Sequence, residues 1–370
     1  MIAPSALIVS ASAGTGHVSA GRALHSAFES AGCARVVHVD VLDLAPRWVR
    51  TAYGGGFELL ASRAPGVWGE VYRRSDGRVD EARWGSIARR LMFREFERLL
   101  TAERWSVCVC THFLPGQLAA GRANAPPFAS VVTDFTLHRY WVRPRINQYF
   151  VATPDMARDL YARLPSARVV ATGIPVGPEF ADRTPQAHAR AVLSLPLTGR
   201  IALVMGGGLG IGVEDSARAA LVSGIADLHV VAVCGRNGAA RANLLRLGAG
   251  DRLQVLGYVD DVATWIAAAD VVVTKPGGLT CSEALAVGRP LVLTRPIPGH
   301  EDANVQYLTA RGAAIAAPTA DDVTAALRNL MHDPAVLGGY TWRAHGAGTP
   351  GAAHSIAATL LRRMTRTSVA

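Results

Sequence analysis

The residues with the clearest chemical potential lie between Asp270 and Asn304. A short β-branched run, Val271–Val273, predicts a buried strand, and Pro276 and two glycines end it. Such a strand-to-helix turn leaves backbone N–H groups at a helix N-terminus, where the helix dipole favours an anion. Thr280 and Glu283 have the spacing of a capping box, but the Glu283 carboxylate could instead accept hydrogen bonds from a ribose diol. This motif alone leaves both interpretations open.

The N-terminal region places a histidine in a similar turn. An apolar strand at Ala6–Val9 leads through Gly14 and Gly16 to His17, and a helix is expected over Val18–Ala31. Open α/β sheets bind ligands at their carboxyl edge, and a neutral imidazole there can act as a general base. A histidine at a helix start could equally be hydrogen-bonded to the backbone, so both interpretations stay open.

The second half of the chain contains a third glycine-rich turn. Gly206–Gly212 lies between an expected strand, Ile201–Met205, and an expected helix, Val213–Ser223. Gly207 and Gly208 are candidates for diphosphate contacts, because glycine lets backbone N–H groups approach an anion closely. The alternative is a loop that packs tightly against a neighbouring element.

Length and composition limit the function classes. A chain of 370 residues is long enough for two domains, and a hydrophobic fraction of 50% suits buried parallel sheets. The formal charge of +9 comes almost entirely from arginine, since Lys275 is the only lysine. We attribute this bias to a GC-rich coding sequence rather than to a nucleic-acid partner, although it allows attraction to anionic lipid. Five cysteines without a CxxC or Cys/His cluster predict free thiols in a reducing cytoplasm and no metal site.

Two further features concern membranes. No signal peptide is recognisable, and no apolar run reaches the ~18 residues that a membrane-spanning helix needs. The segment Trp48–Trp105, with Arg47 before it, combines four of the seven tryptophans with twelve arginines, as expected of a surface at lipid headgroups. Amphipathic helices with solvated arginine faces would give the same composition. Any membrane contact is therefore expected to be peripheral.

The order of strands and helices predicts an α/β fold with two doubly wound parallel sheets. We expect an N-terminal domain at 1–180, a second domain at 200–335 and a helical segment at 336–370 that packs back on the first domain. The polar, irregular stretch Ala181–Gly199 is the expected linker. Two such domains do not specify a function on their own.

Seven sequence blocks occur in one order and point to a known family. They are SASAGTGHVSAGRAL, VVTDFTLHRYWVRPRINQYFVA, ATGIPVGPEF, VMGGGLGIG, VCGRN, LGYVDDVATWIAAADVVVTKPGGLTCSEALAVGRPLVL and PIPGHEDANVQYL. Together they resemble the monogalactosyldiacylglycerol synthase and processive diacylglycerol glucosyltransferase family, in glycosyltransferase family 28. The resemblance covers nearly the whole chain and is weakest from Ala45 to Arg104 and after Asp333.

The resemblance implies a GT-B fold, with two facing Rossmann-like domains and an interdomain cleft. The C-terminal half would bind UDP-galactose or UDP-glucose. The N-terminal half would hold a lipid acceptor such as diacylglycerol and dock on the anionic inner face of the plasma membrane. The transfer would invert the configuration of the sugar without needing a metal. The alternatives are a polyprenyl-linked or secondary-metabolite acceptor, or a UDP-sugar epimerase on the same fold.

The resemblance also suggests which residues are catalytic. Family members related to the plant monogalactosyldiacylglycerol synthase often carry an aspartate in the turn before the N-terminal glycines. This chain has Ser12 and Ala13 at that place. This departure makes His17 the expected catalytic base and Asp134 the second candidate. A His base would remove the proton of the acceptor hydroxyl as its oxygen attacks C1 of the sugar.

The donor site follows from the same resemblance. Glu283 would bind the ribose hydroxyls, and Glu301 with Asn304 would bind the sugar hydroxyls. Lys275 is either a neighbour of the diphosphate or a simple charge at the end of a strand. The full set of expected donor-binding residues is Gly207, Gly208, Val259, Gly277, Gly278, Thr280, Glu283, Glu301 and Asn304.

Overall fold

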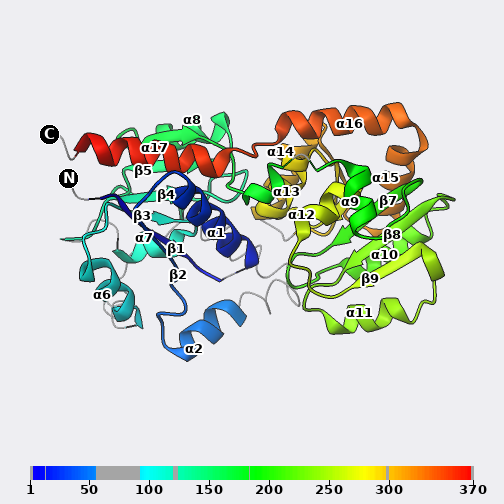
Figure 1. Ribbon diagram of the computed structural model, residues 1–370, viewed down its shortest axis with the longest axis horizontal. Coiled ribbons are helices and arrows are strands. Elements are labelled where there is room, and N and C mark those ends of the chain that lie inside the picture. Colours follow the sequence, from blue (N-terminus) through cyan, green and yellow to red (C-terminus); the bar gives the residue numbers. More distant parts are fainter. Residues whose placement is uncertain are drawn as a thin grey trace. The chain divides into compact units, whose positions relative to one another are not determined.

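The computed structural model describes residues 3–12, 14–55, 92–119, 124–182, 184–296 and 300–367, and the chain divides into two compact units (Figure 1). The first unit is built mainly from Met1–Pro178 and Gly351–Ala370, and the second from Glu179–Ile297 and Glu301–Pro350. Most of the aromatic and arginine-rich segment that the sequence singles out, residues 56–91, lies outside the described residues.

The first unit contains a six-stranded sheet whose strands are all parallel, in the order β2-β1-β3-β4-β5-β6. The apolar, β-branched sequences of its central strands are buried on both faces, as parallel sheets require. The strands are β1 (Ser5–Ser10), β2 (Arg35–Asp40), β3 (Val107–Cys110), β4 (Phe128–Val131), β5 (Gln148–Val151) and β6 (Arg168–Ala171).

Helices from both ends of the chain cover this sheet. The C-terminal helix α17 packs on the first helix α1 (Figure 1). Ile356 and Leu360 share one buried cluster with Leu24 and Phe28. The described helices of the first unit are α1 (Thr15–Ser30), α2 (Arg47–Arg50), the π-helix η1 (Thr51–Gly55), α6 (Arg94–Ala102), α7 (Phe113–Ala119), α8 (Pro154–Arg163) and α17 (Ala352–Thr367).

The second unit repeats the architecture, with a parallel sheet in the order β12-β11-β10-β7-β8-β9. The predicted pair of doubly wound parallel sheets is therefore confirmed. The strands are β7 (Arg200–Met205), β8 (Leu228–Val233), β9 (Leu253–Leu256), β10 (Val271–Thr274), β11 (Leu291–Leu293) and β12 (Ala314–Ala316).

Local sequence signals set several helix boundaries of the second unit. Thr319 and Asp322 form a capping box at the start of α15, and Asp261 accepts a hydrogen bond from the Thr264 N–H at the start of α12. The helices are α9 (Gln186–Val192), α10 (Val213–Leu221), α11 (Gly238–Leu245), α12 (Val262–Ala268), α13 (Gly278–Val287), α14 (His300–Ala310), α15 (Ala320–His332) and α16 (Pro334–Ala347), with the 3-10 turns η2 (Pro178–Phe180) and η3 (Gly250–Arg252).

The segment 336–370 is divided between the units. Helix α16 belongs to the second unit, and α17 belongs to the first. The expected helical segment is present, but α16 does not pack back on the first domain as predicted. Gly338 and Gly339 weaken this helix, whereas Pro334 at its first turn and the Asp333 cap favour its start. Among the residues that the structure describes, no helix is long and apolar enough to cross a membrane.

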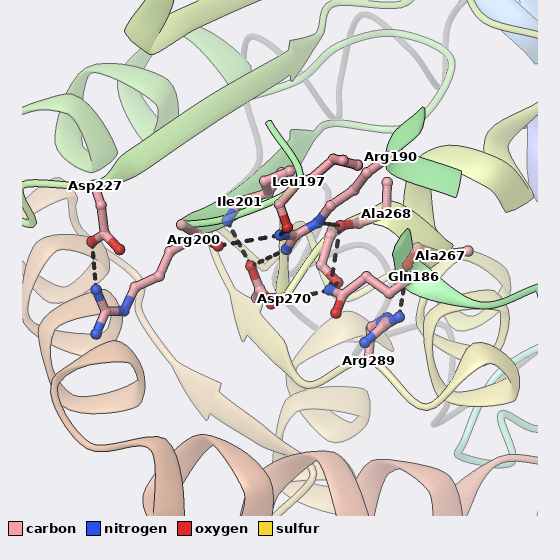
Figure 2. A network of polar contacts seen from close by, with 12 residues as sticks. Gln186, Arg190, Leu197, Arg200, Ile201, Asp227, Ala267, Ala268, Asp270 and Arg289 are labelled. Atoms are coloured by element: carbon pink, nitrogen blue, oxygen red, sulfur yellow. Dashed lines mark hydrogen bonds and ion pairs between the residues drawn. The ribbon is translucent and has the colours of Figure 1, made fainter. Parts of the chain in front are cut away.

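A buried ion pair between Arg190 and Asp270 stabilises the amino edge of the second sheet (Figure 2). Asp270, directly before β10, accepts hydrogen bonds from Arg190 Nη2 at 2.8 Å, from the Ile201 N–H at 2.6 Å and from Gln186 Nε2 at 3.0 Å. Arg190 also donates to the carbonyl oxygens of Ala268 and of two residues that precede β7. This network ties α9 to the start of β7 and β10, at the edge opposite to the glycine-rich turns.

Candidate functional site

Each sheet has one point where the strand order reverses, and the sequence-predicted residues gather at these two points. In the first unit the chain runs outward from β1 to β2, and then from β3 towards β6 on the other side. In the second unit the reversal lies between β7 and β10. Loops at the carboxyl ends of such neighbouring strands diverge, which creates the usual ligand site of an open α/β sheet.

His17 lies at the reversal point of the first sheet, in the first turn of α1. Its Nδ1 atom is 2.8 Å from the backbone oxygen of Thr111, directly after β3, and 3.0 Å from Oγ1 of Thr133, in the loop after β4. The Thr111 hydroxyl donates in turn to the backbone oxygen of His17 at 2.8 Å. Because a carbonyl oxygen only accepts, Nδ1 must carry the proton, and Nε2 is the basic atom of the neutral ring.

A second histidine supports this arrangement. The rings of His17 and His112 meet edge to face with centroids 4.6 Å apart. His112 is fully buried, and its Nδ1 accepts the Leu114 N–H at 3.0 Å. Burial and then the charge of His17 hold the pKa of His112 well below its usual range, so His112 stays neutral beside His17.

Asp134, the second catalytic candidate, directly follows Thr133 and is half-buried in the loop after β4. The residue that contacts His17 is therefore Thr133, which precedes Asp134 in the sequence. Asp40, at the end of β2, holds the first turn by accepting the N–H groups of Ser12 at 3.2 Å and Leu42 at 2.9 Å. No motif in the sequence marks Asp40, Thr133 or His112 as part of this site; only the position of each at or just after a strand end could have indicated them.

In the second unit the tight-packing interpretation of the glycine-rich turn is correct for two of its glycines. A Cβ at Gly206 would overlap the backbone of Ile211, and one at Gly210 would overlap the carbonyl oxygen of Cys234. These glycines permit tight packing. Gly207 adopts φ +65°, and a Cβ there would meet only the Lys275 side chain, at 3.7 Å from Cε. The turn after β7 therefore lies against the turn after β10.

Helix α13 begins two residues before the predicted cap. Gly277 is its N-cap, with no side-chain hydrogen bond at the cap, and Gly278 is its first residue. The prediction that Thr280 caps the helix and forms a capping box with Glu283 is wrong, because Thr280 already lies within the first turn. The N-terminal N–H groups of α13 consequently point out of the helix without a side-chain cap, as an anion site requires.

Glu283 lies further along α13 and is half-buried. Burial, and then the negative charge of Glu179, raise the pKa of its carboxyl to about 8. A partly buried carboxyl beside a second negative charge is costly to ionise without a hydrogen-bond donor. A ligand that offers hydroxyl donors would relieve this cost.

Lys275 and Glu301 form an ion pair beside these turns. Lys275 Nζ lies 2.5 Å from Oε1 of Glu301, whose side chain is 1% exposed. Asn304 is also buried, and its Nδ2 donates to the carbonyl oxygen of Pro276 at 2.9 Å. Both predicted sugar-binding residues of α14 therefore contact the turn after β10, and Lys275 is more than an isolated charge at a strand end.

Val259 occupies the loop after β9 and is half-buried next to the exposed Tyr258. This loop opens at the same carboxyl edge of the sheet as the turns after β7 and β10. Within the described ranges, no group of three or more His, Cys, Asp or Glu side chains is placed to hold a metal ion.

Comparisons with known proteins follow the same division of the chain. Residues 17–176 match the family model of monogalactosyldiacylglycerol (MGDG) synthase, and residues 203–337 match the glycosyltransferase family 28 C-terminal domain. The chain belongs to this glycosyltransferase family.

Curated relatives of the family include processive diacylglycerol beta-glucosyltransferases. The Bacillus pumilus protein is 34% identical over 213 residues, which are 56% of this chain and 55% of the relative. That alignment thus spans about half the length of the relative. A Bacillus cereus protein of the same name is 28% identical over 348 residues, which are 90% of this chain and 87% of the relative.

Solved structures agree with the family's fold. The crystal structure of Acinetobacter baumannii MurG has a TM-score of 0.63 at 16% identity and covers 97% of this chain and 99% of its own. The S. aureus MnaA–UDP co-structure has a TM-score of 0.61 at 14% identity and covers 95% and 94%. At such identities the likeness shows the fold alone, which is the GT-B fold of two Rossmann-like domains. This confirms the predicted fold class.

Proposed function

We propose that the chain is an inverting hexosyltransferase that moves galactose or glucose from a UDP-sugar to the hydroxyl of diacylglycerol. The observation that carries the proposal is the hydrogen bond from His17 Nδ1 to Thr111, which makes Nε2 the basic atom. His17 would take the proton of the acceptor hydroxyl while the hydroxyl oxygen forms its bond to C1 of the sugar. Attack opposite to the departing UDP would invert the configuration.

The second unit would bind the donor. UDP gains negative charge on its diphosphate as the C1–O bond breaks, and the backbone N–H groups of Gly207, Gly208 and Gly278 would stabilise it. The predicted contact through the Gly277 N–H is set aside, because this group already donates to the carbonyl oxygen of Lys275 at 2.8 Å. Since the tight packing of Gly206 and Gly210 fixes the turn that carries Gly207 and Gly208, and Gly278 starts α13, these groups would be preorganised and the transfer would need no metal. Glu283 would accept the ribose hydroxyls.

The acceptor class rests on the similarity to proteins that are named processive diacylglycerol beta-glucosyltransferases. A peripheral position at the anionic inner face of the plasma membrane would give access to this lipid. The side chain of Trp48 is 64% exposed on α2, between Arg47 and Arg50. An exposed tryptophan flanked by arginines is suited to lipid headgroups.

The test is incubation with UDP-galactose or UDP-glucose and diacylglycerol in mixed micelles, with and without EDTA. We expect a glycosyldiacylglycerol of β-configuration, seen by mass spectrometry and NMR, and unchanged turnover with EDTA. A polyprenyl phosphate-linked sugar serves as the alternative acceptor. Turnover of the UDP-sugar without any acceptor would indicate an epimerase, and absence of UDP binding in calorimetry would refute the donor site.

A further inference from the structure

We propose that Thr133 is a positioning residue of the transfer reaction: it holds the Nδ1–H of His17 from β4 while Thr111 holds it from β3. This inference rests on the proposed function, because it assigns a role relative to His17 as the base. Nothing in the sequence pattern distinguishes Thr133 from an ordinary strand-end threonine.

The two contacts at His17 Nδ1 determine the direction of each hydrogen bond. One ring nitrogen carries at most one proton, and the Thr111 carbonyl oxygen at 2.8 Å can only accept it. The Thr133 hydroxyl oxygen at 3.0 Å must then be a second acceptor of the same N–H, in a shared hydrogen bond. In the other tautomer, the Nδ1 lone pair would face the lone pairs of the Thr111 carbonyl oxygen at 2.8 Å, which is repulsive.

The scaffold around Thr133 is rigid. Thr111 and Thr133 are both buried at the ends of neighbouring parallel strands, and the Thr111 N–H donates to the carbonyl oxygen of Val9 on β1. Two acceptors on adjacent strand ends therefore fix the plane of the imidazole as well as its tautomer. The edge-to-face contact with His112 limits rotation of the ring further.

This geometry matters most when the base becomes charged. During transfer, the acceptor proton passes to His17 Nε2, the acceptor oxygen bonds to C1, and the bond pair between C1 and the UDP oxygen leaves with UDP. The resulting imidazolium presents a more acidic Nδ1–H, so both acceptors bind it more strongly than in the resting state. Thr133 would thus lower the barrier through His17, without touching either substrate.

Other titratable groups lie on the elements at this edge of the first sheet and bear on the pH dependence of the reaction. They are His112 after β3, Asp134 and His138 in the loop after β4, His38 and Asp40 on β2, and Tyr53 on η1. All of them persist in a Thr133 variant, so a change that follows the loss of one hydroxyl is not caused by removing one of these groups.

The experiment compares Thr133→Val, Thr133→Ser and Thr111→Val under saturating substrates across pH. Valine keeps the shape of threonine but cannot accept a hydrogen bond, so Thr133→Val should lower kcat about tenfold. Because an acceptor at Nδ1 favours the protonated ring, its loss should also move the acidic limb of the pH–rate profile to lower pH. Thr133→Ser should restore both values.

Thr111→Val is the matched control. It removes the hydroxyl that anchors the His17 backbone but keeps the carbonyl acceptor, so we expect a lower Tm with the acidic limb in place. If Thr133→Val keeps kcat within twofold of wild type and leaves the acidic limb in place, the role of Thr133 is overturned. The proposed base still stands in that case if His17→Ala lowers kcat by 10²–10⁴-fold. If His17→Ala itself is as active as wild type, both fail. UDP affinity, measured separately, should be equal in all variants.

Discussion

Replacing Asp270 by alanine should strongly destabilise the second unit. The substitution removes the acceptor of three hydrogen bonds, from Arg190, Gln186 and the Ile201 N–H (Figure 2). Arg190 is 5% exposed, so its charge would be left in the interior without its carboxylate partner. Breaking a buried ion pair by removing one partner costs about 3–5 kcal/mol, and we expect a loss of this size.

A matched control lies in the same unit. Arg200 and Asp227 also form an ion pair, but their side chains are 32% and 49% exposed. Such a pair contributes about 0–1 kcal/mol, so Asp227→Ala should have little effect. Asp270→Asn, which keeps one acceptor oxygen, should fall between the two alanine variants.

Hydrogen exchange read by mass spectrometry is the appropriate assay. A chain of two units does not have a single free energy of unfolding, whereas exchange reports the opening of individual segments. Peptides that cover β7 and β10 should lose protection in Asp270→Ala, and those of β1 and β3 should not. If Asp270→Ala loses no more protection than Asp227→Ala, the network does not stabilise the sheet.

Three further predictions concern the donor half. Folding raises the pKa of Glu283 from its ordinary value of 4.5 to about 8, so between these pH values the folded state binds a proton that the unfolded state releases, and stability should fall as pH rises. Glu283→Gln should therefore flatten the dependence of Tm on pH in this range. Equal slopes of Tm against pH in the variant and the wild type would contradict this. Gly210→Ala should abolish UDP binding in calorimetry, because its Cβ would overlap the carbonyl oxygen of Cys234. Gly248→Ala is the control and should retain UDP binding, because Gly248 has a similar φ of +59° and a Cβ there would meet no other atom. Lys275→Met should lower Tm more than Glu301→Gln, because only the first leaves a buried carboxylate without its cation; the reverse order would show that this ion pair does not stabilise the turn after β10.

Local patterns were sufficient for the sheets but not for the site. The apolar run at Val271–Val273 predicted β10 to within one residue, since a buried parallel strand is recognisable from its own sequence. The start of α13 was misjudged because a capping-box spacing is common, and the conformation of Gly277 decides where the helix begins. The partners of His17 are 94 and 116 residues away, so only the topology brings them together.

The return of α17 to α1 has a consequence for the synthesis of the chain. The buried cluster that contains Phe28 is completed by Ile356 and Leu360, so the first unit cannot shield this apolar surface until α17 has left the ribosome. The second unit, by contrast, is almost contiguous and can fold earlier, reversing the usual order in which N-terminal domains fold first. A nascent chain should therefore depend on chaperones until α17 emerges, and a stop codon shortly after residue 350 should leave an aggregation-prone first unit beside a folded second one.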